Sequence, residues 1–332
     1  MQNRDLVFKD YHKVFSLQPE EFEPWALEIF YHQAAGNPVY SDYIKALGLQ
    51  PAAIRRLEDI PFLPIRFFKN REVVTGDHTP QKIFESSGTT GMQNSRHLVA
   101  DLSLYEESFT RCFERFYGPV KDWCILGLLP SYLERNNSSL VYMTEKLIKA
   151  SGNKDSGFYL HEEEKLVEKL KNLEQGGQPV WLIGVSFALL DLAEKYELQL
   201  KHTVVLETGG MKGRREELIR PQLHERLCRS FHLPAIHSEY GMTELLSQAY
   251  SKGAGLFQTP SWMRVLVRDE EDPFQVSRQG RGTLNIIDLA NIHSCSFIAT
   301  DDIGELRADG QFEVWGRVDG SDLRGCSMLL IR

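Results

Sequence analysis

Two patterns of apolar and polar positions alternate along the central part of the chain. Between about residues 100 and 240, stretches with apolar residues at helical spacing alternate with short apolar runs such as Val180–Val185. Such runs are typical of strands that are buried on both faces, and helices between them indicate βαβ units. The pattern predicts helices at 140–150, 161–173, 187–196 and 214–230, and strands at 123–129, 180–185, 203–206 and 235–238. We therefore expect an α/β fold with mostly parallel, helix-covered sheets.

The two ends of the chain have other patterns. Residues 1–70 carry aromatic and aliphatic side chains at helical spacing, with a break at Asn37–Pro38, which predicts helices. From about Ser261 the apolar residues alternate in short runs separated by Gly and Asp turns, which indicates antiparallel strands. We expect three regions: a helical flank of the main domain at 1–80, an α/β core at 81–260, and an antiparallel β subdomain at 261–332.

Composition and charge exclude several classes of protein. The 332 residues are 42% hydrophobic and 25% charged, and the net charge of -8 argues against a nucleic-acid partner, which would require a basic surface. We expect no membrane partner and a cytoplasmic location, because no apolar run approaches the roughly 20 residues of a membrane span and no signal peptide is recognisable. The five cysteines are scattered without a C-x-x-C pair, which argues against a disulfide framework or a zinc site.

A loop rich in hydroxyls and glycines follows Ile83–Phe84. Its sequence, Ser86-Ser87-Gly88-Thr89-Thr90-Gly91, suits a polyanion, because glycine lets backbone N–H groups approach a ligand and the hydroxyls add donors. The alternative interpretation is an ordinary turn between two strands.

Four further polar stretches fall where a nucleotide-binding sheet would place them, near the ends of strands. Gly209 and Gly210 permit close approach of a flat ring, although a plain strand-to-helix turn has the same composition. Glu244, in Tyr-Gly-Met-Thr-Glu, is a hard oxygen ligand that suits Mg²⁺ or, alternatively, caps a helix. Asp302 can accept hydrogen bonds from ribose hydroxyls, and Arg317 can reach a phosphate; otherwise they are a turn acid and a surface charge.

Taken in order, these motifs resemble those of the adenylate-forming superfamily over residues 84 to 325. The resemblance implies that ATP and Mg²⁺ are the cofactors, with Glu244 as the magnesium ligand. It implies nucleotide-binding roles for the hydroxyl and glycine loop, the strand-end motifs and the carboxyl-terminal acid and arginine: Ser86, Ser87, Gly88, Thr89, Thr90, Gly91, Gly209, Gly210, Tyr240, Gly241, Thr243, Asp302 and Arg317.

The carboxyl-terminal residues narrow the resemblance to the acyl-protein synthetase family. The hinge-like Gly316–Gly325 runs directly into Cys326, and we expect the small carboxyl-terminal lysine domain of the superfamily to be absent. The resemblance implies that a carboxylic acid, expected to be a fatty acid, is adenylated and passed to Cys326 and then to an acyl-CoA reductase-like partner. A thiolate is a strong nucleophile for such a step. Arg96 is a candidate phosphate clamp, because the lysine that often follows the loop is missing.

Three alternatives stay open at this stage. A phenylacetate-type ligase would deliver the same acyl-adenylate to CoA. The run Gly184-Val185-Ser186-Phe187-Ala188 is similar to the nucleophile elbow of α/β-hydrolases. A nucleotide sensor without catalytic activity is the third. On the main hypothesis, Ser186, Phe187 and Met211 line the pocket for the acyl group.

Overall fold

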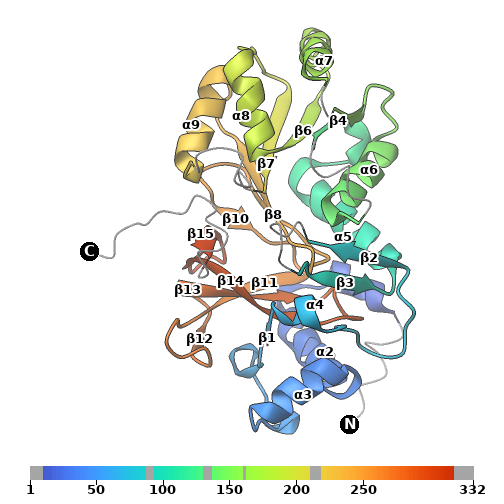
Figure 1. Cartoon of the computed structure of the whole chain (residues 1–332), viewed down its shortest axis with the longest axis vertical. Coiled ribbons are helices and arrows are strands. Elements are labelled where there is room, and N and C mark those ends of the chain that lie inside the picture. The colour runs from blue at the N-terminus through green and yellow to red at the C-terminus, as the bar shows by residue number, and fades with distance from the viewer. Residues whose placement is uncertain (1–9, 87–92, 130–136, 160–161, 210–217, 318–332) are drawn as a thin grey trace. The chain divides into compact units, whose positions relative to one another are not determined.

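The computed structural model describes residues 10–86, 93–129, 137–159, 162–209 and 218–317 (Figure 1). Contacts group the chain into two compact units: residues 1–112, 241–248 and 259–314 form the first, and 113–240, 249–258 and 315–332 form the second. Residues 1–80 thus share a unit with most of 261–332. The division of the chain at residues 80 and 260 into a helical flank, an α/β core and a β subdomain stays a prediction.

Helices α2 (Phe22–Gly36) and α3 (Pro38–Ala46) form the start of the first unit. Phe22, Ala26, Ile29 and Phe30 lie on one face of α2 and are fully buried. Asn37 ends α2 and begins α3, because its side-chain oxygen accepts a hydrogen bond from the backbone N–H of Tyr40 at 3.1 Å. The break predicted at Asn37–Pro38 is confirmed. The same part of the chain contains short 3₁₀ turns and one single-turn helix: Tyr11–Ser16, Pro19–Glu21, Pro51–Ala53, Leu57–Asp59 and α4 (Phe67–Asn70).

An antiparallel sheet makes up the rest of the first unit. Strands β12 (Val276–Ser277), β11 (Met263–Arg268), β13 (Gly280–Asp288), β14 (Phe297–Leu306) and β15 (Phe312–Arg317) lie in that order, and the last three residues of β15 belong to the second unit. The short β1 (Leu63–Pro64) pairs in parallel with β14. A separate hairpin joins β2 (Lys82–Glu85) to β3 (Arg96–Val99), with Glu85 opposite Arg96. The antiparallel pairing predicted for the carboxyl-terminal third is confirmed.

The second unit contains a row of mostly parallel strands. Neighbouring strands run in the order β10 (Phe257–Gln258), β9 (Ala249–Ser251), β8 (His237–Tyr240), β7 (Thr203–Thr208), β6 (Val180–Val185), β4 (Cys124–Leu128) and β5 (Gly157–Phe158). The pairs from β8 to β5 are parallel. The helices of this region are α5 (Leu102–Tyr117, which begins in the first unit), 3₁₀ Val120–Asp122, α6 (Ser139–Ser151), α7 (Glu163–Gln175), α8 (Ser186–Lys195) and α9 (Arg220–Phe231). Helices α8 and α9 lie side by side in Figure 1.

Several predicted boundaries in the second unit differ from the structure by a few residues. The helix predicted from residue 214 begins, within the described residues, at Arg220, because Ile219 is extended and Pro221 fits only the first turn of a helix. The strand predicted at 235–238 lies at His237–Tyr240. The prediction of a mostly parallel α/β fold with an antiparallel carboxyl-terminal part is confirmed. Within the described residues, no helix is both long and apolar enough to cross a bilayer.

Candidate active site

The base of the predicted phosphate loop is closed by two serines. The backbone N–H of Ser86 donates to the carbonyl oxygen of Ser95 at 3.0 Å, and the N–H of Ser95 donates to Ser86 Oγ at 2.9 Å. These bonds extend the β2–β3 ladder by one step and bring the two ends of the loop together. The loop residues Ser87, Gly88, Thr89, Thr90 and Gly91 lie outside the described residues. Arg96 begins β3, is partly exposed, and lies 3.7 Å from the carboxylate of Glu72.

The segment that carries Glu244 is held by a fully buried carboxylate. Asp288, at the end of β13, accepts hydrogen bonds from the backbone N–H groups of Leu246 and Ser247 at 2.8 and 2.9 Å, and from Ser247 Oγ at 2.6 Å. Burial raises the pKa of Asp288, whereas these hydrogen bonds lower it. The Glu244 side chain is 4% exposed. The segment from Thr243 to Ser247 therefore has a fixed backbone.

Asn291 and His97 complete the support of this segment. Asn291 Nδ2 donates to the carbonyl oxygens of Glu244 at 2.8 Å and Cys295 at 3.0 Å, so Asn291 Oδ1 faces His97 Nε2 at 3.0 Å. The other ring nitrogen, Nδ1, lies 2.8 Å from the carbonyl oxygen of Thr243. Both neighbours of the ring are acceptors. Burial lowers the pKa of His97 to about 4 against the effect of these contacts, and a neutral ring carries one N–H, so it donates to only one of them.

The remaining nucleotide-site candidates lie on strands or directly after them, and Asp302 lies within β14 rather than at a strand end. Asp302, on β14 of the first unit, is 6% exposed, and its backbone N–H donates to Thr300 Oγ1 at 3.2 Å. In the second unit, Tyr240 ends β8 with its ring 5.9 Å from that of Phe257, and Arg317 ends β15 partly exposed. Gly209 follows β7 with φ +67°, a conformation that glycine adopts readily. Gly210 and Met211 lie outside the described residues, and Gly241 is exposed.

A buried polar cluster lies at the carboxyl ends of β6 and β7. Ser186 Oγ is 3.1 Å from Glu207 Oε2 and 2.8 Å from the carbonyl oxygen of Gly209. The other oxygen of Glu207 accepts from Arg220 Nε at 3.1 Å and lies 3.5 Å from His224 Nε2. Burial by itself raises the pKa of Glu207, but the hydrogen bond from His224 and the charge of Arg220 lower it to about 2. Glu207 Oε2 and the carbonyl oxygen of Gly209 both accept from Ser186 Oγ, which is unlike a serine nucleophile activated by histidine. Phe187, the next residue, is buried.

The pKa of a second glutamate nearby is shifted in the opposite direction. Glu239, on β8, accepts a hydrogen bond from Thr208 Oγ1 at 2.5 Å. Burial raises its pKa to about 7, the hydroxyl of Thr208 opposes this, and the charge of Glu207 adds to it. The cluster therefore holds one ionised and one readily protonated carboxyl group on adjacent strands.

The described cysteines are poor candidates for an acyl-accepting thiol. Cys112, Cys124 and Cys295 are buried, and Cys228 is partly buried. Burial raises the pKa of Cys124 and Cys228, and it raises the pKa of Cys295 to about 12. A thiol must be accessible and ionised to attack an acyl group. Cys326 lies outside the described residues.

The residues present fit magnesium shared with a nucleotide better than a metal held by protein alone. Among the residues that the structure describes, no group of three or more His, Cys, Asp or Glu side chains could hold a metal ion. Mg²⁺ commonly takes one or two protein carboxylates and completes its shell with water and substrate phosphates. Glu244, on a fixed backbone in the same unit as the phosphate-loop hairpin, fits that requirement.

The structure brings some of the predicted residues together and adds others. His97 links the strand that begins with Arg96 to the Thr243–Glu244 segment within one unit. Sequence reasoning missed His97, Asp288 and Asn291, whose residue types give no signal without their partners. It also missed Glu207. An acidic residue directly after the apolar run Val204–Leu206 was a usable signal for that site.

Known structures show which class of fold this is. ATP-bound MatB from Rhodopseudomonas palustris matches 71% of this chain and 47% of its own, with a TM-score of 0.54 and 17% identity. O-succinylbenzoate Coenzyme A synthetase (MenE) from Bacillus subtilis, in complex with ATP and magnesium ion, matches 71% and 49%, with a TM-score of 0.51 and 17% identity. The match thus spans about half the length of each enzyme. The fold is that of the adenylate-forming enzymes.

Sequence comparison assigns the family. The model of the acyl-protein synthetase family, LuxE, matches residues 5–332, and the chain belongs to this family. A long-chain-fatty-acid–luciferin-component ligase from Vibrio harveyi is 23% identical over 98% of this chain and 91% of its own. The predicted family and ligase class are confirmed, and the fold is the one expected for the predicted superfamily.

Proposed function

We propose that this protein uses ATP to convert a long-chain fatty acid into an acyl-adenylate and then transfers the acyl group to a thiol, first to Cys326 and then to a partner protein. The observation that supports the adenylation step is a contact between two segments that would hold ATP and its magnesium ion. The strand that leaves the phosphate loop and the segment of Glu244 are joined through His97 and Thr243 at 2.8 Å in one compact unit.

A carboxylate is a poor electrophile, so the acid must be activated as an acyl-adenylate before a thiol can attack it. A fatty-acid carboxylate attacks the α-phosphorus of ATP, forms a C–O–P bond and releases pyrophosphate. The loop hydroxyls, backbone N–H groups and Arg96 would bind the phosphates, and a magnesium ion at Glu244 would supply positive charge for the transferring oxygens. Asp302 would hold the ribose and Tyr240 the adenine. Cys326, as a thiolate, then displaces AMP and forms a thioester.

The choice of Cys326 is supported by the condition of the other thiols. All four described cysteines are buried or partly buried, and the pKa is raised for three of them, Cys124, Cys228 and Cys295. Each would need exposure before it could react. The name of the relative from Vibrio harveyi, a long-chain-fatty-acid–luciferin-component ligase, supports both the substrate class and a partner protein that receives the acyl group.

Pyrophosphate exchange and acyl labelling test the two halves separately. Wild-type protein should exchange labelled pyrophosphate into ATP only when a long-chain fatty acid is present, and it should retain labelled acid as a hydroxylamine-sensitive thioester. Cys326→Ser should keep the exchange and lose the label, whereas the matched Cys228→Ser should keep both. Undiminished label on Cys326→Ser would exclude that cysteine, and an absence of acid-dependent exchange in wild type would exclude adenylation.

Two alternatives have distinct outcomes in the same experiments. Formation of acyl-CoA by Cys326→Ser would favour the phenylacetate-type CoA ligase. Hydrolysis of a p-nitrophenyl ester that is lost in Ser186→Ala would favour the hydrolase, which the acceptor partners of Ser186 argue against. Exchange in wild type would exclude the nucleotide sensor.

A further inference from the structure

Three buried side chains lie behind Glu244 without a role in the proposed chemistry. His97, Asp288 and Asn291 are each at most 1% exposed, and they come from β3 and from the end of β13 and the turn after it. Buried polar groups of this kind are retained only with partners, because desolvation is costly. Four of their hydrogen-bond partners are backbone atoms of the segment from Thr243 to Ser247, and a fifth is Ser247 Oγ. We call these three residues the clasp.

We propose that the clasp positions the Glu244 carboxylate for the divalent cation that accompanies ATP, which rests on the proposed function. Asn291 Nδ2 holds the backbone carbonyl of Glu244 itself at 2.8 Å. His97 Nδ1 lies 2.8 Å from the carbonyl oxygen on the amino-terminal side, at Thr243, and Asp288 accepts from two N–H groups on the carboxyl-terminal side, at Leu246 and Ser247. The backbone is therefore fixed before, at and after the ligand residue.

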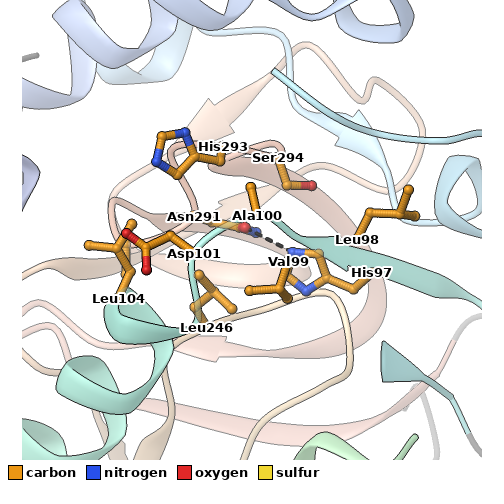
Figure 2. A pocket seen from close by; sticks show the side chains of 11 residues that line it. His97, Leu98, Val99, Ala100, Asp101, Leu104, Leu246, Asn291, His293 and Ser294 are labelled. Atoms are coloured by element: carbon orange, nitrogen blue, oxygen red, sulfur yellow. Dashed lines mark hydrogen bonds between the residues drawn. The ribbon is translucent and has the colours of Figure 1, made fainter. Parts of the chain in front are cut away.

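The clasp acts through the backbone rather than by contact with substrate. His97, Leu246 and Asn291 are among the residues that line a cavity of about 10 Å³. Figure 2 shows these side chains, with the contact between His97 and Asn291 as a dashed line. This volume is about that of one water-sized sphere. No nucleotide or acyl group fits there, so the three residues are positioning residues and Glu244 is the group that would contact the ion.

The clasp also connects the cation ligand to the phosphate loop. His97 follows Arg96 in β3, and β3 pairs with β2, from which the loop begins. A rigid connection sets the distance between the carboxylate and the phosphates that must share one ion. Groups that orient metal ligands typically change metal affinity by about 10- to 100-fold when they are replaced.

Asn37 provides a matched control for Asn291. It is also a fully buried asparagine of the first unit, and its Nδ2 donates to the carbonyl oxygen of Ser294 at 3.0 Å. The partners of its side chain, Thr75, Ser294 and Tyr40, lie outside the segment of Glu244. Asn291→Ser and Asn37→Ser should therefore lower the melting temperature similarly while only the first disturbs the cation ligand.

Binding of Mn²⁺ in the presence of a non-hydrolysable ATP analogue, followed by electron paramagnetic resonance on the full chain, tests the proposal. Asn291→Ser should weaken Mn²⁺ binding by about 10-fold or more. Asn37→Ser should bind Mn²⁺ as the wild type does. In pyrophosphate exchange, Asn291→Ser should need correspondingly more Mg²⁺, while the KM for the fatty acid stays within about twofold. His97→Gln, which keeps an N–H donor, should be affected less than His97→Leu.

The outcomes separate the clasp from the proposed function. Equal Mn²⁺ affinity in Asn291→Ser and Asn37→Ser, with nucleotide-dependent binding in wild type, would overturn the clasp alone. A wild type that binds no Mn²⁺ with the nucleotide analogue would overturn both. Hydrogen exchange in the unliganded protein adds a readout independent of catalysis: the amides of Leu246 and Ser247 should exchange faster in Asn291→Ser than in Asn37→Ser, and equal rates would contradict the mechanism.

Discussion

Replacement of Glu239 by glutamine should stabilise the protein at alkaline pH and leave it unchanged at acidic pH. Burial raises the pKa of this carboxyl group from 4.5 to about 7. The folded protein therefore holds the Glu239 proton more tightly than the unfolded chain does. Below pH 4.5 the group is protonated in both states. Between 4.5 and 7 the unfolded chain ionises first, so stability falls as pH rises, and above 7 the full penalty is present.

The size of this penalty follows from the change in pKa. A rise of this extent corresponds to about 3 kcal/mol. The Glu239 side chain is only partly buried, so solvent screening reduces the expected value to about 1–2 kcal/mol. Glu239→Gln, which removes the ionisable group and keeps its shape, should recover this amount at pH 8 and almost none at pH 4.5.

Urea unfolding of wild type and Glu239→Gln at pH 5, 6, 7 and 8 measures the effect. The difference in unfolding free energy should grow steadily with pH and level off near pH 8. Thr208→Val is the informative control, because the Thr208 hydroxyl donates to Glu239 at 2.5 Å and lowers its pKa. Without that donor the pKa should rise further, and the levelling should move to higher pH. A difference between wild type and Glu239→Gln that is the same at pH 5 and pH 8 would refute the reasoning.

Three further predictions concern stability. Glu207→Gln should lower the free energy of unfolding by about 3 kcal/mol at pH 6, because the pKa of Glu207 is about 2 in the folded protein and 4.5 in the unfolded chain, so its ionised form stabilises the fold at that pH. The loss should shrink as the pH falls toward 2, and urea unfolding between pH 3 and 6 measures it. Gly304→Ala should destabilise by more than about 2 kcal/mol, since a Cβ there would overlap the backbone carbonyl of Glu313, whereas Gly157→Ala meets open space; parallel melting curves compare the two. Leu182→Ala, at a fully buried position of β6, should cost about 2–5 kcal/mol in urea unfolding.

The elements that sequence predicted best are those whose signal is local. Val180–Val185 is an unbroken apolar run and forms β6 with the predicted bounds. The end of α5 also has a local signal: Gly118, the residue after the helix, has φ +81°, and its N–H donates to the carbonyl oxygen of Glu114. The start of α9 was harder, because a helical pattern continues upstream of Pro221 although the first turn begins only at Arg220.

The candidate site divides in the same way. Glycine, hydroxyl and acidic residues in a fixed order predicted the family, because each motif is contiguous. The clasp could not be predicted, since His97 meets residues 146 and 194 positions away. Nothing in the neighbours of a single histidine or asparagine indicates such a pairing.

The sequence by itself determined the types and order of the elements and the ordered set of adenylate-forming motifs, because hydrophobic period and motif order are properties of neighbouring residues. The tertiary structure alone decided which buried groups meet and in what protonation state they are held. Glu207 and Glu239 are both glutamates on adjacent strands, yet the pKa of one is lowered to about 2 and that of the other is raised to about 7. The difference comes from Arg220 and His224 beside one and burial of the other, and desolvation and charge depend on packing rather than on the chain's local sequence.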